Sequence, residues 1–531
     1  MQDCNRPLHL APAVRRAELQ LRAIANAPVP RRAGALRSEE GCLPARSSPP
    51  SKRLSHIIEP SGRGRLARRI VLLLFVVAAA ATAVISLRPR RGAMERWMNG
   101  MRAKGERFTL QELVSSWKPS TNDIMDLIES AAAQFKRLTT AGTNRQSGVR
   151  QNPNSKLRTV AWAEPNLCSA TGVALDWETL DYQADQVHGV LNDLRAALSE
   201  PPSDTGLDYS QPTSRLNFVA KREVAQRLFD LTIYELRNHN LTNAQENLRA
   251  LIGMAFLHSE DRTISGQMIR SAIEGLAAEA VWQALPAKGW TDEQLAAVQA
   301  DLTRISIFHE LAAALRVERA HGLKFFEVMR KDSGWNANVF GFGLPLGGGK
   351  SGIFDHAGFL LWQQLWSERD GLLYVQVMQI GIDCLDELER RHSFADSARG
   401  PKAAYDRLER EAESPVKYRY LWSLVALPNY VRIFENAVRN ETWRQLAIGA
   451  IALERFKLRH GSPPARLSDL QPEFLSELPV DCYNGRPLRF RLNADGGFDL
   501  YSVGENFRDD GGNGSLDLVW PKPLWPAQAG Q

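Results

Sequence analysis

Cysteine is scarce in this chain, whose 531 residues include only Cys4, Cys42, Cys168, Cys384 and Cys482. No two of them form a CxxC pair and no histidine stands at zinc-ligand spacing, so the sequence specifies neither a disulfide framework nor a structural zinc site. Long apolar runs are also scarce, which excludes a polytopic membrane protein. With 44% hydrophobic and 24% charged residues, the composition is typical of globular proteins, and the length favours more than one folding unit.

The basic character of the chain is confined to its first segment. Residues 1–69 contain 14 Lys/Arg and five Asp/Glu, whereas the formal net charge of the whole chain is only +6. Because the rest is therefore net negative, we expect no specific nucleic-acid partner. Apolar residues are too sparse in 1–69 to form a core, so this segment is predicted to be a disordered cytoplasmic arm. Nonspecific binding to RNA or DNA and a mistaken start codon are the alternatives.

One apolar segment, Ile70–Leu87, is long enough to cross a bilayer. Its 18 residues carry no charge and are flanked by arginines on both sides, and as a helix they would extend about 27 Å, close to the thickness of the hydrocarbon core. We therefore expect a single-pass signal anchor that places the chain in a lipid bilayer. A buried helix of a soluble domain and a cleaved signal sequence are the alternatives.

The orientation of this anchor follows from the arm. The lysines and arginines within 20 residues of the span are balanced on its two sides, so local charge does not decide the topology. Translocation of the highly basic arm is unfavourable. We therefore expect the N-terminus to be cytoplasmic and the bulk of the chain to be extracytoplasmic.

Residues 94–286 have the periodicity of amphipathic helices. Apolar side chains recur at intervals of three and four in 123–138, 180–198, 215–237, 244–258 and 264–285. Short polar turns separate the last three of these segments, and helices joined by short turns lie antiparallel. The predicted fold class is mainly α, with an extended body of helical hairpins. No clean repeat period is present.

Further helices are expected in 287–423, interrupted by a glycine-rich connector at 333–352. Thr291 is predicted to cap one of them. The sequence GLPLGGGKS at 343–351 lacks the first glycine of a phosphate-binding loop, and Ala313 stands where a zinc-protease helix starting at His309 needs its second histidine. The adjacent charges Glu318 and Arg319 are interpreted as lying on a partly exposed helix flank rather than as a buried pair.

Residues 424–520 are predicted to form a small α+β module. A long helix over 428–461 ends at Gly461, which is followed by two prolines and suits a helix C-terminus. A short helix is expected near 467–470. The alternating sequence LRFRLN and the sequence GFDLYSV, separated by a turn-forming segment, predict an antiparallel hairpin.

Three stretches of this module carry a family resemblance: ALERFKLRHGSPPARLSDL, LPVDCYNGRPLRFR and DGGFDLYSVGENFRDDGG. Together they resemble the globular part of the major pseudopilin of type II secretion, and they are similar to a C-terminal module of bacterial single-pass membrane proteins with no assigned activity. The resemblance implies a long helix packed on a small antiparallel sheet, and a location at the bacterial inner membrane. In pseudopilins the apolar helix comes directly before the globular part, whereas in this chain the apolar segment lies far from the C-terminal module in sequence.

The resemblance also implies a candidate calcium loop, because the last loop of the major pseudopilin binds this ion. The corresponding loop offers oxygen ligands of the kind that calcium prefers: Glu505, Asp509, Asp510, Asn513 and Asp517. The alternative is a turn-rich loop satisfied by its own backbone. No other cofactor is indicated.

Two classes of function remain after these observations. The first is a noncatalytic, membrane-anchored scaffold or interaction protein that binds an envelope protein, with a role in type II secretion as a variant. The second is an extracytoplasmic hydrolase-like enzyme whose site is assembled from dispersed residues: His309, Glu310, Glu318, His321 and His356. Convergence of these residues in one cleft would favour the enzyme.

Overall fold

The structure is a computed structural model of the chain, and it describes residues 92–113, 124–142, 177–207, 217–331, 360–414, 417–493 and 497–521, with short pieces at 162, 167–168, 174–175 and 209. The predicted arm at 1–69, the predicted membrane span at 70–87 and the glycine-rich connector at 333–352 lie outside these residues. Among the residues that are described, no helix is both long and apolar enough to cross a bilayer.

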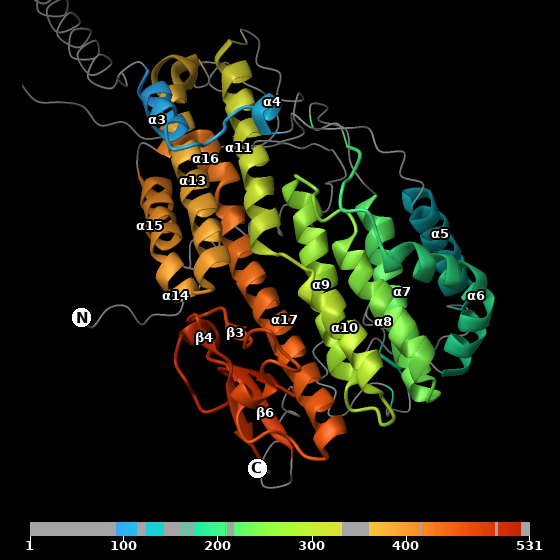
Figure 1. Ribbon diagram of the computed structural model, residues 1–531. Helices are drawn as coiled ribbons and strands as arrows, with labels where there is room; N and C mark the ends of the chain where they lie inside the picture. Colours follow the sequence, from blue (N-terminus) through green and yellow to red (C-terminus); the bar gives the residue numbers. More distant parts are fainter. Residues whose placement is uncertain are drawn as a thin grey trace, which may run out of the picture. The chain divides into compact units, whose positions relative to one another are not determined.

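The described chain is mainly helical, as the sequence predicts (Figure 1). The α-helices are α3 (Ala93–Arg102), α4 (Leu110–Leu113), α5 (Ile124–Gly142), α6 (Trp177–Ser199), α7 (Phe218–Arg237), α8 (Leu241–Phe256), α9 (Ile264–Ala284), α10 (Asp292–Thr303), α11 (Phe308–Lys331), α13 (Ser367–Arg391), α14 (Phe394–Ser397), α15 (Arg399–Glu413), α16 (Leu421–Ala426) and α17 (Pro428–His460). Single turns of other helix types lie at Trp362–Trp366, Lys417–Tyr420, Leu467–Leu470 and Gly504–Asn506.

Helices α7, α8, α9 and α10 begin at the polar residues that end each turn. The side chains of Asn217, Asn240 and Thr263 each accept a hydrogen bond from a backbone N–H in the first turn of the helix that follows. Thr291 does the same for α10, as predicted, and Gln294 completes a reciprocal capping box that the sequence analysis did not identify. The predicted antiparallel hairpins of α7, α8 and α9 are confirmed, and these three helices pack on one another.

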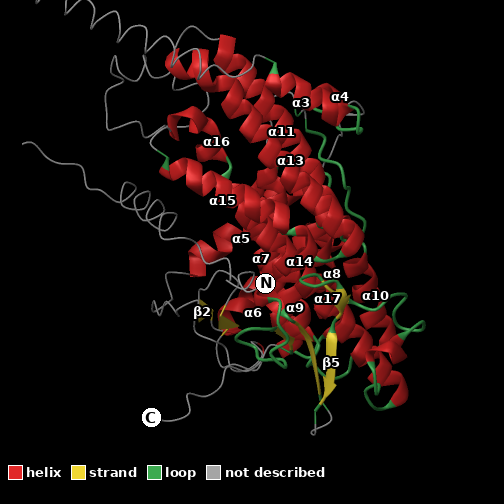
Figure 2. Cartoon of the chain, turned by 90° about the vertical axis from the view of Figure 1, so that its left-hand side faces the viewer, coloured by secondary structure: helices red, strands yellow, loops and turns green. Residues whose placement is uncertain are grey.

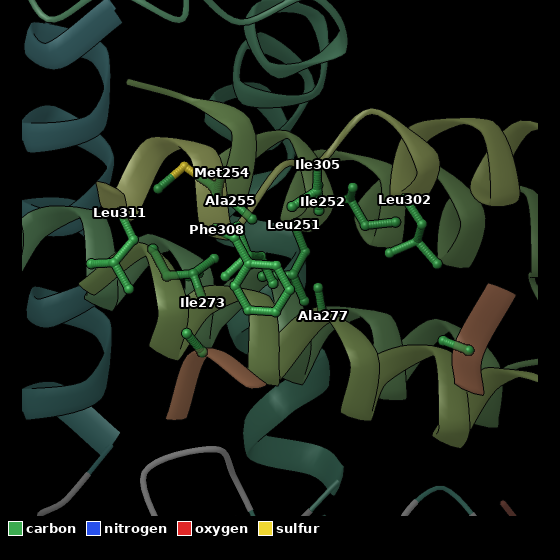
Figure 3. Close-up of a cluster of buried hydrophobic side chains, with 14 of the residues drawn as sticks. Leu251, Ile252, Met254, Ala255, Ile273, Ala277, Leu302, Ile305, Phe308 and Leu311 are labelled. Atoms are coloured by element: carbon green, nitrogen blue, oxygen red, sulfur yellow. The ribbon is translucent and has the colours of Figure 1, made fainter. Parts of the chain in front are cut away.

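The core of this body lies where α8, α9 and α11 meet. Figure 3 shows the ring of Phe308, at the start of α11, among Leu251 of α8 and Ile273 and Ala277 of α9. All four side chains are buried. Burial of the three large side chains, Phe308, Leu251 and Ile273, stabilises the fold by about 1.5–3 kcal/mol each.

Helix α11 also packs lengthwise against α13, and Arg319 lies fully buried at this interface. The interpretation of Arg319 as a partly exposed flank residue is therefore wrong. Its guanidinium donates to Glu106 over 2.9 Å and to the backbone carbonyl of Arg107 over 2.6 Å, and it lies over the ring of Phe108. A buried arginine needs such partners, and here they come from the segment between α3 and α4 rather than from the adjacent Glu318.

A second buried charge, Asp370 of α13, holds the start of α16. Its carboxylate accepts hydrogen bonds from the indole N–H of Trp362, from the backbone N–H groups of Trp422 and Ser423, and from the Ser423 hydroxyl at 2.6 Å. Burial raises the pKa of Asp370 to about 6, although every one of these hydrogen bonds favours the charged form.

The C-terminal part combines α17 with short antiparallel strands, as predicted. Gly461 ends α17 in the left-handed conformation, at φ 78°. The strands are β3 (Val480–Asp481), β4 (Arg486–Pro487), β5 (Arg489–Leu492), β6 (Phe498–Ser502) and β7 (Leu518–Trp520), while β1 (Leu167–Cys168) and β2 (Ala174–Leu175) form a separate pair that the sequence did not predict. Strand β5 pairs with β6 in the predicted hairpin, and β7 extends this sheet along the other edge of β6. Figure 2 shows β5 in this part of the molecule.

Helix α17 belongs to the helical body as much as to the sheet. It packs against α9 and α10, and also against β3, β6 and β7. At the N-terminus of α10, Asp292 accepts hydrogen bonds from Arg455 over 2.6 Å and from Arg459 over 2.5 Å. Packed helices thus connect the segments on either side of residues 287 and 424, and the described residues from 92 onward cluster as one compact unit.

The buried carboxyl of Asp370 predicts a pH-dependent stability. Its folded pKa of about 6 exceeds the ordinary value of 3.8, so between these values the folded chain binds the proton more tightly than the unfolded chain. The stability that protonated Asp370 contributes is therefore present below pH 4 and is lost as pH rises through 6, by at most about 1.4 kcal/mol per pH unit. The measurement is the free energy of unfolding in urea. We expect the value for the wild type minus the value for Asp370→Asn to fall as the pH rises from 4 to 6. Parallel pH profiles of the two proteins would contradict this prediction.

Candidate functional site

Asp517 and Asn513 of the candidate calcium loop serve to hold the loop's own backbone. Asp517 is buried, and its carboxylate accepts the backbone N–H groups of Gly512 over 2.8 Å and of Asn513 over 3.1 Å. In return, the carbonyl of Asn513 accepts the N–H of Asp517 over 2.7 Å. Burial raises the pKa of Asp517. This carboxylate is directed at backbone amides, which an ion would have to replace.

The other three residues of the loop are each bound to a different protein donor. Glu505 forms an ion pair with Arg439 of α17, Asp509 accepts a hydrogen bond from Arg489 over 3.3 Å, and Asp510 accepts one from an asparagine side chain of the same loop. Within the described ranges, no three His, Cys, Asp or Glu side chains are grouped so that they could hold a metal ion. These residues do not form a ready coordination set, and calcium binding stays a prediction.

The dispersed residues of the alternative enzyme site are not brought together where they are described. Four of the five lie along α11, and the fifth lies outside the described residues: His309, Glu310, Glu318, His321 and His356. His309 is exposed, Glu310 is paired with Arg262, and the ring of His321 bonds to the carbonyl of Tyr209. Twelve residues of helix separate His309 from His321 by about 18 Å, so one substrate atom cannot contact both.

A cavity that the sequence analysis did not anticipate lies between α6, α8 and α10. Its volume is about 280 Å³, near the lower end of ligand-binding pockets. Three arginines and two carboxylates share the lining with Leu198, Ala250 and Phe256. The five charged residues are Arg195, Glu246, Arg249, Asp301 and Arg304. Because the arginines outnumber the carboxylates, the lining is net positive.

Arg195 is held in a fixed position at this cavity. Its side chain is only 10% exposed, its Nη1 pairs with Glu246 over 2.9 Å, and its Nε donates to Asn247 over 2.9 Å. Burial lowers the pKa of this guanidinium. Its Nη2 is buried and has no hydrogen-bond partner. A buried donor without a partner is unfavourable by about 1–3 kcal/mol. Because Nη2 has almost no exposed surface, it does not face the cavity, and Arg195 contributes a fixed positive charge to the lining rather than a free donor.

The other two arginines differ in whether a carboxylate balances their charge. Arg249 donates to both carboxylate oxygens of Asp301, over 2.6 Å and 3.4 Å. Arg304, just after α10, is exposed and lies over the ring of Phe256 at 4.7 Å. No carboxylate in the described part of the chain forms an ion pair with Arg304. The excess positive charge of the lining is therefore located at Arg304.

Close contact between α6 and α8 forms one wall of this cavity. A methyl group added at Gly253 of α8 would lie 2.2 Å from the carbonyl oxygen of Leu198. Only glycine permits this approach of the two backbones. A pattern in the sequence of α8 could have indicated this wall of the cavity. Four residues recur at intervals of three and four and therefore share one face of the helix: Glu246, Arg249, Gly253 and Phe256.

The helix contact at Gly253 can be tested with a matched pair of glycine substitutions. Gly253→Ala is expected to lower the free energy of unfolding by about 1–3 kcal/mol, because α6 and α8 must separate. Gly275→Ala, within α9, places its methyl no closer than 3.6 Å to a neighbouring atom and should stabilise the protein by up to about 1 kcal/mol through helix propensity. Equal effects in urea unfolding would show that the α6–α8 contact is not as close as described.

Comparisons with protein-family models, with curated proteins and with solved structures found no match to this chain. The geometry described above is therefore the basis for the functional conclusion.

Proposed function

We propose that this chain is a membrane-anchored, extracytoplasmic scaffold whose helical body carries a pseudopilin-like C-terminal part toward an envelope protein partner. In this proposal the apolar segment Ile70–Leu87 is a permanent tether in the bacterial inner membrane, and the arm at 1–69 is cytoplasmic. The partner belongs to the cell envelope, and the type II secretion apparatus is the specific candidate that the resemblance suggests.

The observation that carries this proposal is that both ends of the described chain are built into one helical body. The segment after the apolar stretch is fixed by Arg319, which reaches Glu106 over 2.9 Å across 213 positions of sequence. The C-terminal part is fixed through Asp292, Arg455 and Arg459. A single body that includes both the residues following the predicted tether and the C-terminal part suits a protein that presents a binding surface.

The C-terminal part also exposes apolar side chains suited to docking. Leu492, at the end of β5, is 45% exposed, and Leu516, before β7, is 49% exposed. Phe507 lies between them in sequence, is also exposed and stacks on Phe394 of α14. Leu492 and Leu516 lie at the two ends of the same small sheet, because Leu492 pairs with Phe498 at the start of β6 and Leu518 pairs with Ser502 at its end. Exposed apolar side chains on this part of the chain are the basis for proposing a docking surface that extends along the sheet. The enzyme alternative has no comparable support, because its described residues are spread along α11.

The tether is tested by fractionation of cells that express the full-length chain. We expect the protein to sediment with membranes and to resist extraction at alkaline pH, because a spanning helix is released only by detergent. Deletion of residues 70–87 should move it to the supernatant. Recovery of the intact chain in the supernatant without detergent would remove the membrane-anchored part of the proposal.

The docking surface is tested by chemical crosslinking in the native membrane, followed by identification of the captured proteins. The double variant Leu492→Asp and Leu516→Asp should reduce capture of a specific envelope protein roughly ten-fold, because charges replace apolar contacts at the interface. Val219→Asp is the control, since Val219 is 69% exposed on α7, within the helical body. Equal capture by both variants would place the binding surface elsewhere.

A further inference from the structure

We infer that the cavity between α6, α8 and α10 binds a small oxyanion, a carboxylate or phosphate group borne by a ligand with a short apolar portion. This inference is independent of the proposed scaffold function. It concerns a site that no motif in the sequence indicates, and it rests on the geometry of three guanidinium groups.

The charge balance of the lining favours an anion over a cation. Glu246 and Asp301 are already engaged, with Arg195 over 2.9 Å and with Arg249 over 2.6 Å. Arg304 adds a positive charge that no described carboxylate balances. An entering anion would therefore complete the charge balance of the site, whereas an entering cation would have to displace an arginine from its carboxylate.

The donors are the kind that recognise oxyanions. Guanidinium groups present planar pairs of N–H donors that match the oxygen spacing of carboxylates and phosphates. Arg249 uses Nε and Nη2 on Asp301, which leaves its Nη1 for a ligand. Arg304 is exposed and is paired with no described carboxylate, so its guanidinium is the second group available to a ligand. The site is also pre-organised, because Glu246 and Asn247 fix Arg195 before any ligand arrives.

Size and apolar lining limit the ligand to a small molecule. A cavity of about 280 Å³ lies near the lower end of the range for ligand-binding pockets, which favours a small molecule. Leu198, Ala250 and Phe256 provide an apolar wall. The guanidinium of Arg304 lies over the ring of Phe256, so the apolar wall and the positive charge of the site are adjacent.

Calorimetric titration of the full-length protein in detergent tests this inference. The probes are inorganic phosphate and succinate, each compared with sodium chloride at the same ionic strength. We expect one of them to give saturable binding of one molecule per chain. The stronger probe then identifies the oxyanion as phosphate or as carboxylate.

Two arginine substitutions make the result specific to the cavity. Arg304→Gln should weaken binding of the better probe about ten-fold, because a charged donor is lost. Arg304 is exposed, so the variant should keep the melting temperature of the wild type. Arg410→Gln, an exposed position on α15, should bind as the wild type does. The inference is overturned if neither probe binds more than chloride does, or if the two variants bind equally.

Discussion

The packing of α17 on two sides is the constraint on which the rest of the structure depends. One side of this helix lies against α9 and α10, and the other supports the strands of the C-terminal sheet. Polar contacts fix its register: Arg444 donates to the carbonyl of Leu302 at the end of α10 over 2.9 Å, and Arg455 donates to the side chain of Gln299 of α10 over 3.1 Å. A small sheet of short strands buries too little apolar surface to be stable alone. Its stability therefore depends on a helix that the body also holds.

Charged side chains act as long-range connectors in this architecture. Arg319 joins the segment before α4 to the α11–α13 pair, Asp370 joins α13 to α16, and Asp292 joins α10 to α17. Each connects segments that are distant in sequence. Arg319 and Asp370 are buried, so removal of their partners would leave an uncompensated charge in the interior. The interior is thus specified by a few directed contacts as well as by apolar packing.

The sequence predicted the local structure well, for physical reasons that apply to each element. Apolar spacing of three and four determined α7, α8 and α9, polar residues at the turns determined where they begin, and Gly461 determined where α17 ends. The same reasoning failed for Arg319, because its partner Glu106 is 213 positions away. It also missed the cavity, whose charged lining comes from three helices. Only the tertiary structure brings such side chains together, and no spacing within a single helix reports their convergence.

Native-state hydrogen exchange, followed by mass spectrometry at increasing denaturant, tests most directly whether α17 unites the body and the sheet. If it does, the amides of α9, α10, α17 and β6 will become exchangeable in a single cooperative opening with one free energy. A lower-energy opening that exposes α17 and β6 together, while α9 and α10 stay protected, would show that the C-terminal part is a separate folding unit and would contradict the account.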